Sequence, residues 1–96
     1  MNEKTNRTLV LFTNDGCNGC NVVHDILSKE WAYHHRLFKY KEIDCSENPE
    51  LARLYNVQGV PFVIMLDGET AFDSLIGVHH PDKYKSAIEK WLTGEW

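Results

Sequence analysis

Hydrophobic and polar positions divide this 96-residue chain into short segments with two kinds of periodicity, separated by polar or glycine-containing turns. Residues 8–13 and 60–66 are almost continuously apolar and rich in β-branched side chains, which predicts buried strands. Residues 37–43 alternate between apolar and polar and predict another strand. Residues 69–75 follow an Asp-Gly pair, a strong hairpin signal, and predict a strand that pairs with the segment before it.

Three other segments place their apolar residues at helical spacing. One covers residues 18–32, one is a short stretch after Pro49, and the last begins at Pro81. Proline suits the first turn of a helix, and Asn48 can cap the short one. The apolar residues are Val22, Val23, Ile26, Leu27 and Trp31 in the first segment, Leu51, Ala52, Leu54 and Tyr55 in the second, and Tyr84, Ala87, Ile88, Trp91 and Leu92 in the third.

The predicted order of elements is β-α-β-α-β-β-α, an α/β fold. We assign residues 1–96 to one domain, with its core between about residues 8 and 93. The first two strands are joined by a helix and should be parallel, with a right-handed crossover. The last two form an antiparallel hairpin, so we expect a mixed four-stranded sheet with helices on both faces. Coverage of both faces explains why two of the strands are continuously apolar.

Composition and charge narrow the function classes. The chain is 43% hydrophobic and 25% charged, and it has no apolar run long enough to span a membrane. Its formal net charge of −4 argues against a surface that binds nucleic acid or an anionic membrane. We also expect the protein to be a monomer. Residues 1–7 lack the apolar core and cleavage site of a signal peptide, so the expected compartment is the cytoplasm. A mature secreted chain given a new methionine would look the same.

The strongest chemical signal is Cys17-Asn18-Gly19-Cys20, which follows the first predicted strand and opens the first predicted helix. A helix N-terminus carries roughly half a positive charge and unpaired N–H groups, and both favour a thiolate over a thiol. Thiol pKa values in such places fall from about 8.5 to roughly 3.5–7.5. Cys20, one turn further on, is close enough to close a disulfide. The pair therefore predicts thiol–disulfide exchange, in which one sulfur attacks and the other resolves.

Cys45 is left over from this pair. An odd cysteine count argues against a disulfide framework and indicates a redox pair plus a spare thiol in a reducing compartment. A zinc site would need two further ligands, for which Cys45 and His24 are the candidates, and we expect no metal. Cys45 itself is either a small buried residue or a regulatory or dimer-forming thiol after Asp44.

With these elements in order, the chain resembles the thioredoxin superfamily over roughly residues 8–93. A lone Cys-x-x-Cys is a weak motif, but together with a downstream proline segment it is strong. The chain lacks the N-terminal strand and helix of full thioredoxins, so it looks like a minimal, glutaredoxin-sized version. The ordered signals after the cysteines are Glu42-Ile43-Asp44, Asn48-Pro49-Glu50-Leu51-Ala52, Tyr55-Asn56-Val57-Gln58-Gly59-Val60-Pro61, Leu66-Asp67-Gly68-Glu69 and Gly77.

The resemblance implies a thioredoxin-like fold and a thiol–disulfide oxidoreductase that reduces or exchanges protein disulfides. Cys17 would be the nucleophile, and Cys20 would resolve the mixed disulfide. The Val60–Pro61 bond would be cis, which costs an X-Pro bond only about 0.5–1 kcal/mol, and would offer the Val60 backbone to an extended substrate. Gly77 would give that substrate close access. No metal or organic cofactor is implied, and electrons would come from an NADPH-dependent flavoprotein reductase or from glutathione.

Departures from the family pattern bear on the chemistry. Gly16 stands where thioredoxins usually carry tryptophan, and Asn18-Gly19 stands where they carry Gly-Pro. Asn-Gly is the more flexible pair, so disulfide closure loses more entropy, and we expect a less reducing couple than a typical thioredoxin. Leu11 occupies the position of a usually buried aspartate that accepts the proton of the second cysteine. That proton must then go to water or to another group.

Alternatives to a thioredoxin-type reductant remain open. Glutaredoxins usually have Pro-Tyr or Pro-Phe between the cysteines and a Gly-Gly-x-x-Asp-like segment that binds glutathione. Neither is evident here, where residues 75–80 are Leu-Ile-Gly-Val-His-His. The other hypotheses are a glutathione-linked reductant, a non-catalytic binding module that uses the proline groove, and a dedicated reductant for one enzyme, such as a ribonucleotide reductase.

The histidines carry weaker signals. His24 lies one turn beyond Cys20 and is either a surface residue or a group that tunes the thiols, which would add pH dependence near neutrality. His79 either borders the substrate groove or is a cap or loop residue. His34 and His35 fall in a polar loop, and we expect both on the surface.

Overall fold

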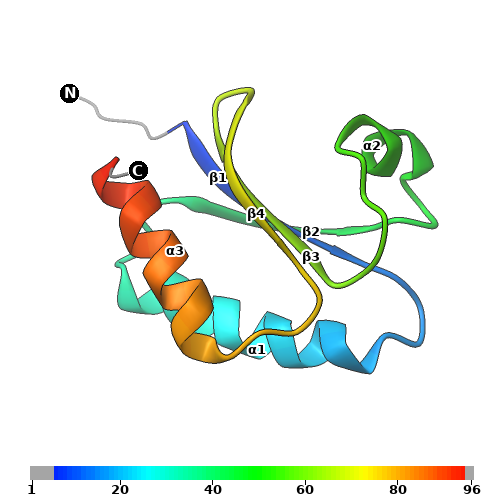
Figure 1. Ribbon diagram of the computed structural model, residues 1–96, viewed down its shortest axis with the longest axis horizontal. Coiled ribbons are helices and arrows are strands. Elements are labelled where there is room, and N and C mark those ends of the chain that lie inside the picture. Colours follow the sequence, from blue (N-terminus) through cyan, green and yellow to red (C-terminus); the bar gives the residue numbers. More distant parts are fainter. Residues whose placement is uncertain (1–5, 95–96) are drawn as a thin grey trace.

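All elements predicted from the sequence are present in the computed structural model, which describes residues 6–94 (Figure 1). Their order is the predicted β-α-β-α-β-β-α, and the mixed α/β architecture is thereby confirmed. The bounds are β1 Arg7–Thr13, α1 Asn18–Tyr33, β2 Lys39–Asp44, α2 Pro49–Leu54, β3 Phe62–Asp67, β4 Thr70–Ile76 and α3 Pro81–Thr93.

The sheet has the strand order β2-β1-β3-β4, with β1 parallel to β2 and antiparallel to β3. The β4 strand returns beside β3 as the hairpin expected at the Asp-Gly turn, with a register shift between Met65 and Leu66. The β1 and β3 strands are therefore central, which is why they carry the continuous apolar runs. In the parallel pair, Leu11 lies beside Glu42, so the end of β2 lies next to the end of β1.

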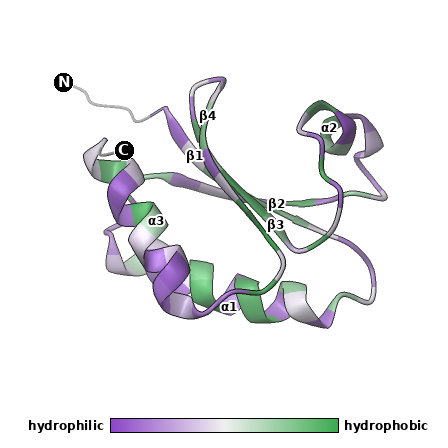
Figure 2. Ribbon diagram, viewed as in Figure 1, coloured by the Kyte–Doolittle hydropathy of each residue, from purple (hydrophilic) through white to green (hydrophobic). Residues whose placement is uncertain are grey.

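Two apolar clusters lie on opposite faces of the sheet, with α1 and α3 on one face and α2 on the other (Figure 1). A strand sends successive side chains to opposite faces, so β1 contributes to both clusters. Leu9 and Leu11 point toward α1 and α3, whereas Val10 and Phe12 point toward α2. Figure 2 shows β3, between these layers, almost wholly hydrophobic. The prediction that helices cover both faces is confirmed.

Two strands begin two residues later than the apolar pattern predicts. In front of β2, Leu37 is exposed and Phe38 turns into the core instead of joining the sheet. The Phe38 ring lies 5.2 Å from the Trp91 ring, and the Phe38 carbonyl accepts a 2.7 Å hydrogen bond from Trp31 Nε1. In front of β3, Pro61 has no N–H to donate to the strand ladder.

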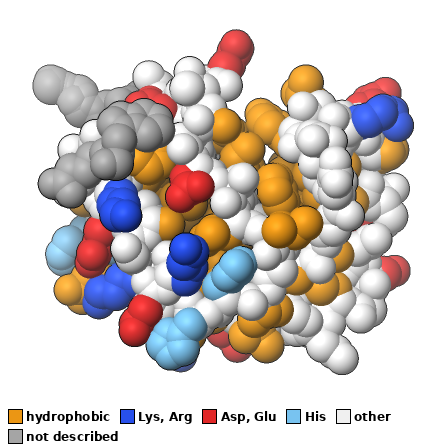
Figure 3. Space-filling model, in the orientation of Figure 1, with side chains coloured by type: hydrophobic (Ala, Val, Ile, Leu, Met, Phe, Trp, Pro, Cys, Tyr) orange, Lys and Arg blue, Asp and Glu red, His pale blue; other side chains and the backbone are white. Residues whose placement is uncertain are grey.

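The last helix separates a buried face from a charged one. Tyr84, Ile88 and Trp91 of α3 are buried against the sheet. Its outer face carries basic and acidic side chains, which gather over this helix in Figure 3, while hydrophobic side chains gather nearer the middle of the same view. Within residues 6–94, no helix is both long and apolar enough to cross a membrane.

Candidate active site

Cys17 and Cys20 form a disulfide at the N-terminus of α1, with their Cα atoms 5.3 Å apart. After β1 a short turn brings the chain into the helix, and Gly16 in this turn has a φ of 72°, a conformation that glycine adopts without strain. Cys17 is the N-cap of α1, and its Sγ accepts a 3.1 Å hydrogen bond from the backbone N–H of Cys20. Cys17 is half-buried, whereas Cys20 is only 4% exposed.

At this N-cap, the sulfur of Cys17 takes the place that an oxygen usually has. The first N–H groups of a helix have no intrahelical partner and carry partial positive charge. When the disulfide is reduced, the N–H of Cys20 and the helix end therefore favour a thiolate at Cys17. Cys17 is also the more accessible of the two residues, so its sulfur is the one positioned to attack another disulfide.

Two further segments lie against the Cys-x-x-Cys turn: Val60–Pro61 before β3, and Gly77–Val78 after β4. The Val60–Pro61 peptide bond is cis. The Pro61 carbonyl accepts a 2.8 Å hydrogen bond from the N–H of Gly77, which ties the two segments together. A Cβ built on Gly19 would lie 3.4 Å from Pro61 Cδ and 2.8 Å from Val78 Cγ2. The fold thus brings all five sequence-predicted site residues into one region.

The backbone N–H and C=O of Val60 are free of hydrogen bonds to described residues, whereas those of Gly77 are both hydrogen-bonded. Among the described residues, no hydrogen-bond partner is present for the N–H or C=O of Val60. Gly77 donates to Pro61 and accepts a 3.0 Å hydrogen bond from the Tyr84 hydroxyl. Its φ of 85° and the open space beside its Cα leave room for close approach. Val60 can therefore supply hydrogen-bonding groups, and Gly77 can supply space.

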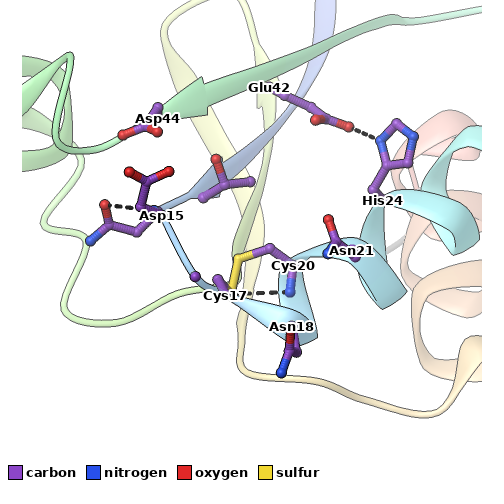
Figure 4. A pocket seen from close by; sticks show the side chains of 11 residues that line it. Asp15, Cys17, Asn18, Cys20, Asn21, His24, Glu42 and Asp44 are labelled. Carbon is purple, nitrogen blue, oxygen red and sulfur yellow. Dashed lines mark hydrogen bonds and ion pairs between the residues drawn. A yellow bond between two sulfur atoms is a disulfide. The ribbon is translucent and has the colours of Figure 1, made fainter.

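An open pocket of about 420 Å³ lies beside the disulfide, between the end of β2, the turn after β1 and the first turns of α1 (Figure 4). Both cysteines line it. The other lining residues are Thr13, Asn14, Asp15, Gly16, Asn18, Asn21, His24, Glu42 and Asp44. This lining is polar and acidic, so the pocket suits water and proton transfer better than the binding of an apolar ligand.

Two ionisable side chains of this pocket point toward one another, His24 from α1 and Glu42 from β2 (Figure 4). His24 Nδ1 contacts Glu42 Oε2, and the Tyr40 hydroxyl donates a 2.5 Å hydrogen bond to the same carboxylate oxygen. The hydrogen bond to Glu42 raises the pKa of His24 above its ordinary value, against the opposing effect of burial. Burial, followed by the contact with Glu42, raises the pKa of Tyr40, so this hydroxyl remains a donor.

The spacing of one helical turn from Cys20 indicates His24 as a candidate site residue. No comparable sequence signal indicates Glu42 or Tyr40, which lie in a strand with an ordinary half-buried pattern. The missing signal is the parallel register. Leu11 pairs with Glu42, and paired residues of a sheet project to the same face. Leu11 faces α1, so Glu42 faces α1 as well and meets His24 there.

The position at which the family usually carries a buried aspartate supplies no proton acceptor here, because it is Leu11. Leu11 is fully buried in the cluster beneath α1. Among residues 6–94, moreover, no polar or charged residue is buried. The titratable groups available to Cys20 are therefore those of the open pocket that it lines.

Cys45 lies apart from this chemistry, in a separate pocket beside α2. Its side chain packs against the apolar cluster on the α2 face of the sheet. Burial, followed by the charge of Asp44, raises the pKa of the Cys45 thiol. These observations fit a packing residue better than a reactive thiol. In the part of the chain that is described, no group of three or more His, Cys, Asp or Glu residues could hold a metal ion.

The remaining histidines have structural contacts. His79 Nε2 lies 2.8 Å from the carbonyl of the last residue of β4, and His80 caps α3 by accepting a hydrogen bond from the second residue of that helix. The loop interpretation therefore fits His79. His35 is exposed, as expected. The surface prediction for His34 is wrong: its side chain is 13% exposed, because it turns back onto Glu30 at 3.3 Å.

Comparisons with known proteins agree with this geometry. The family model for thioredoxin matches residues 1–90. The chloroplastic thioredoxin M4 of Arabidopsis thaliana is 33% identical over 87 residues, which cover 88% of this chain and 44% of that protein. The thioredoxin of Buchnera aphidicola is 25% identical over 69 residues, which cover 72% of this chain and 64% of that protein. The chain thus spans less than two thirds of the length of either relative.

Solved structures share the fold. A thioredoxin variant from Halobacterium salinarum has a TM-score of 0.79 at 24% identity, covering 91% of this chain and 75% of that one. Thioredoxin-2 of the malaria parasite, described as a component of protein secretion machinery, has a TM-score of 0.82 at 21% identity, covering 93% and 86%. These likenesses support the thioredoxin-like arrangement of the sheet and helices. Because the family match also extends over residues 1–90, the chain belongs to the thioredoxin family.

Proposed function

We propose that this protein is a thiol–disulfide oxidoreductase that reduces protein disulfides through Cys17 and Cys20. The observation that carries the proposal is the 3.1 Å hydrogen bond from the N–H of Cys20 to Sγ of Cys17, at the N-terminus of α1. Such a position favours the thiolate that attacks a disulfide. Membership of the thioredoxin family supports the same chemistry.

The proposed reaction has two exchange steps. The Cys17 thiolate attacks one sulfur of the substrate disulfide, and the other substrate sulfur leaves as a thiolate and takes up a proton. The Cys20 thiol then loses its proton and attacks Sγ of Cys17 in the mixed disulfide. This forms the Cys17–Cys20 disulfide and releases the second substrate thiolate, which is protonated in turn. Overall, two electrons pass from the two cysteines to the substrate, together with one proton from Cys20 and one proton from solvent.

Val60, Pro61 and Gly77 are proposed to hold the substrate backbone beside the dithiol. The open N–H and C=O of Val60 suit an extended segment that docks alongside, as in strand addition. Ile76 and Val78 flank the open space at Gly77, and each is 53% exposed. The expected substrate is therefore an extended segment with apolar residues near its disulfide.

The proposed electron donor is an NADPH-dependent flavoprotein reductase, with glutathione as its competitor. The proposed compartment is the cytoplasm, where a free thiol such as Cys45 stays reduced. Immunoblotting of fractionated source cells tests the compartment. The proposed state is a monomer, and light scattering during size-exclusion chromatography tests it.

The first experiment is NADPH oxidation by this protein with thioredoxin reductase and insulin. We expect turnover that disappears in Cys17→Ser and persists in the matched control Cys45→Ser. Cys20→Ser should accumulate mixed disulfides, visible as mass adducts. Equal residual turnover in Cys17→Ser and Cys20→Ser would contradict the assignment. Turnover with glutathione and glutathione reductase alone would make glutathione the donor.

A non-catalytic binding module is the competing hypothesis for the same groove. Such a module would keep its function in the double variant Cys17→Ser/Cys20→Ser, whereas an oxidoreductase would lose it. A reductant dedicated to one enzyme would instead turn over with that client and fail with insulin, while both cysteines remained essential.

A further inference from the structure

The pocket beside the disulfide contains more ionisable chemistry than the attack by Cys17 requires. If the proposed function holds, the second step needs an acceptor for the proton of Cys20, which is only 4% exposed. Leu11, at the position where the family usually has an aspartate, is fully buried among apolar residues, and no charged residue is buried anywhere in residues 6–94. The acceptor must therefore be reached through the pocket that Cys20 lines.

Four titratable side chains other than the cysteines line that pocket: Asp15, His24, Glu42 and Asp44. Carboxylates in water titrate near pH 4 and imidazole near 6.5, so the imidazole is the base closest in strength to a thiolate. Asp44 is disfavoured further, because hydrogen bonds from the hydroxyl and the N–H of Ser46 lower its pKa. His24 is the remaining candidate.

His24 has the placement that this role needs. It follows Cys20 by one turn of α1, so the two side chains project from the same side of the helix. In Figure 4, His24 and Glu42 point toward one another across the gap between α1 and β2, and Cys20 lies at the start of the same helix. Water reaches the His24 side chain, which is 49% exposed.

Glu42 determines which nitrogen of His24 is basic. A carboxylate only accepts hydrogen bonds, so Nδ1 of the neutral ring carries its proton toward Glu42 Oε2. The lone pair then belongs to Nε2. In the described part of the chain, no partner for Nε2 is present. The ring is thus held by one nitrogen and left open for proton transfer at the other.

We propose that His24, held by Glu42, accepts the proton of Cys20 through water in the pocket when Cys20 attacks the mixed disulfide. The S–H bond of Cys20 breaks, and the water passes one proton on to Nε2. The electron pair left on Cys20 Sγ forms the bond to Cys17 Sγ. The bond from Cys17 to the substrate sulfur breaks, and the substrate leaves as a thiolate that takes the proton back through water. His24 is the general base, and Glu42 is a positioning residue.

The charges around His24 suit a ring that gains a proton during the reaction. Glu42 and Tyr40 face it from β2, and Asp25 lies on its own helix. The hydrogen bond to Glu42, and after it the charges of Glu42 and Asp25, raise the pKa of His24, although burial opposes them. A general base is most effective when its pKa lies near the working pH, so this shift favours the transfer.

The test separates the two steps by stopped-flow reaction of the reduced protein with Ellman's reagent, in a Cys45→Ser background. Cys17 attacks the reagent and releases one coloured thiolate, and Cys20 then displaces the second from the mixed disulfide. Both phases are followed between about pH 5.5 and pH 9. Neither a reductase nor a protein substrate is present, so this assay is independent of the insulin assay. Loss of the first phase in Cys17→Ser checks the nucleophile itself.

We expect His24→Gln to slow the second phase by about tenfold at pH 7, less than the 10²–10⁴-fold typical of a base in direct contact. The first phase should change by less than about twofold, because the thiolate of Cys17 is favoured by the helix end. The inflection in the pH profile of the second phase should disappear in His24→Gln and shift to lower pH in Glu42→Gln. Added imidazole should restore the second phase in His24→Ala.

The matched control is His35→Asn, which removes an exposed histidine outside the pocket and places a residue that tolerates the positive φ of 58°. It should leave both phases unchanged. Equal second-phase rates and pH profiles in the parent protein and His24→Gln would overturn the proposal. So would equal slowing of both phases without rescue by imidazole, since that pattern indicates a structural role for His24.

Discussion

Gly19 and Val78 are in direct contact across the Cys-x-x-Cys turn, so closely that a Cβ on Gly19 would lie 2.8 Å from Val78 Cγ2. Such a separation is well inside van der Waals contact. Pro61 Cδ would lie 3.4 Å from the same Cβ. Any side chain at residue 19 would therefore have to displace Val78 in the loop after β4, in addition to any need for backbone freedom.

Gly19→Ala is expected to destabilise the oxidised protein by about 1–3 kcal/mol, the range for overpacking, even though alanine favours a helix over glycine by about 1 kcal/mol. Val78→Ala should have a small effect alone, because Val78 is 53% exposed, and should relieve the clash in the double variant. Denaturant unfolding of all four proteins measures the coupling between the two sites. Purely additive effects would show that the contact does not constrain residue 19.

Tyr84 of α3 forms hydrogen bonds with the backbone of the loop that contains Gly77. Its hydroxyl donates to the Gly77 carbonyl at 3.0 Å and accepts from the N–H of His79 at 3.2 Å, and the side chain is 1% exposed. Tyr84→Phe should lower the free energy of unfolding by about 1–3 kcal/mol, because the Gly77 carbonyl and the His79 N–H each lose a part-buried hydrogen bond. Hydrogen exchange at residues 77–79 should accelerate. The control Tyr33→Phe changes an exposed ring, and a Tyr84→Phe protein as stable as this control would count against the role of the hydroxyl.

His24 should titrate with a pKa above 6.5, and Glu42→Gln should bring that pKa back down toward 6.5. The proton is bound more tightly in the folded state, so the pair stabilises the fold below about pH 6.5. This stability is lost as pH rises through the raised pKa. Both side chains are well exposed, so the contribution should be below about 0.5 kcal/mol. Proton NMR of the imidazole measures the pKa, and a value at or below 6.5 would contradict the ion pair.

The redox potential stays a prediction from the sequence. Thioredoxin has a potential of about −270 mV, and the Asn18-Gly19 pair predicts a less negative value for this protein. In the oxidised structure both residues belong to the first turn of α1. The backbone freedom that they have while the disulfide is open is therefore lost when it closes. Equilibration with defined glutathione ratios, followed by alkylation of the remaining thiols, measures the potential. A value at or below that of thioredoxin would refute the prediction.

Local patterns predicted most of the fold, because each pattern depends only on residues that are close together in the sequence. The apolar runs of β1 and β3 and the Asp-Gly hairpin all lie within short stretches of chain. The start of β2 was not predictable, because Phe38 packs on a distant tryptophan. The late start of β3, by contrast, follows from Pro61, which has no N–H for the strand ladder. The half-buried setting of His34 likewise depends on the way α1 ends, at a point where polar sequence indicates an exposed loop.

The candidate site divides in the same way. Cys17 and Cys20 could be found from the sequence, because the chemistry of a dithiol needs only a strand, a turn and the start of a helix. The partnership of His24 with Glu42 could not, because the two residues are 18 positions apart and meet only through the register of β2 on β1. A pocket assembled from separate elements becomes visible only when the sheet is formed.

Cys17 is at once the N-cap of α1 and the expected nucleophile, so folding and chemistry act on the same atom. The helix end stabilises the thiolate, and the thiolate stabilises the first turn of the helix by the same free energy, because coupling is reciprocal. Bonding of the sulfur to a substrate removes the charge and weakens this anchor. Each turnover is therefore expected to loosen and retighten the turn that carries Cys20, at the stage when Cys20 must move toward its partner.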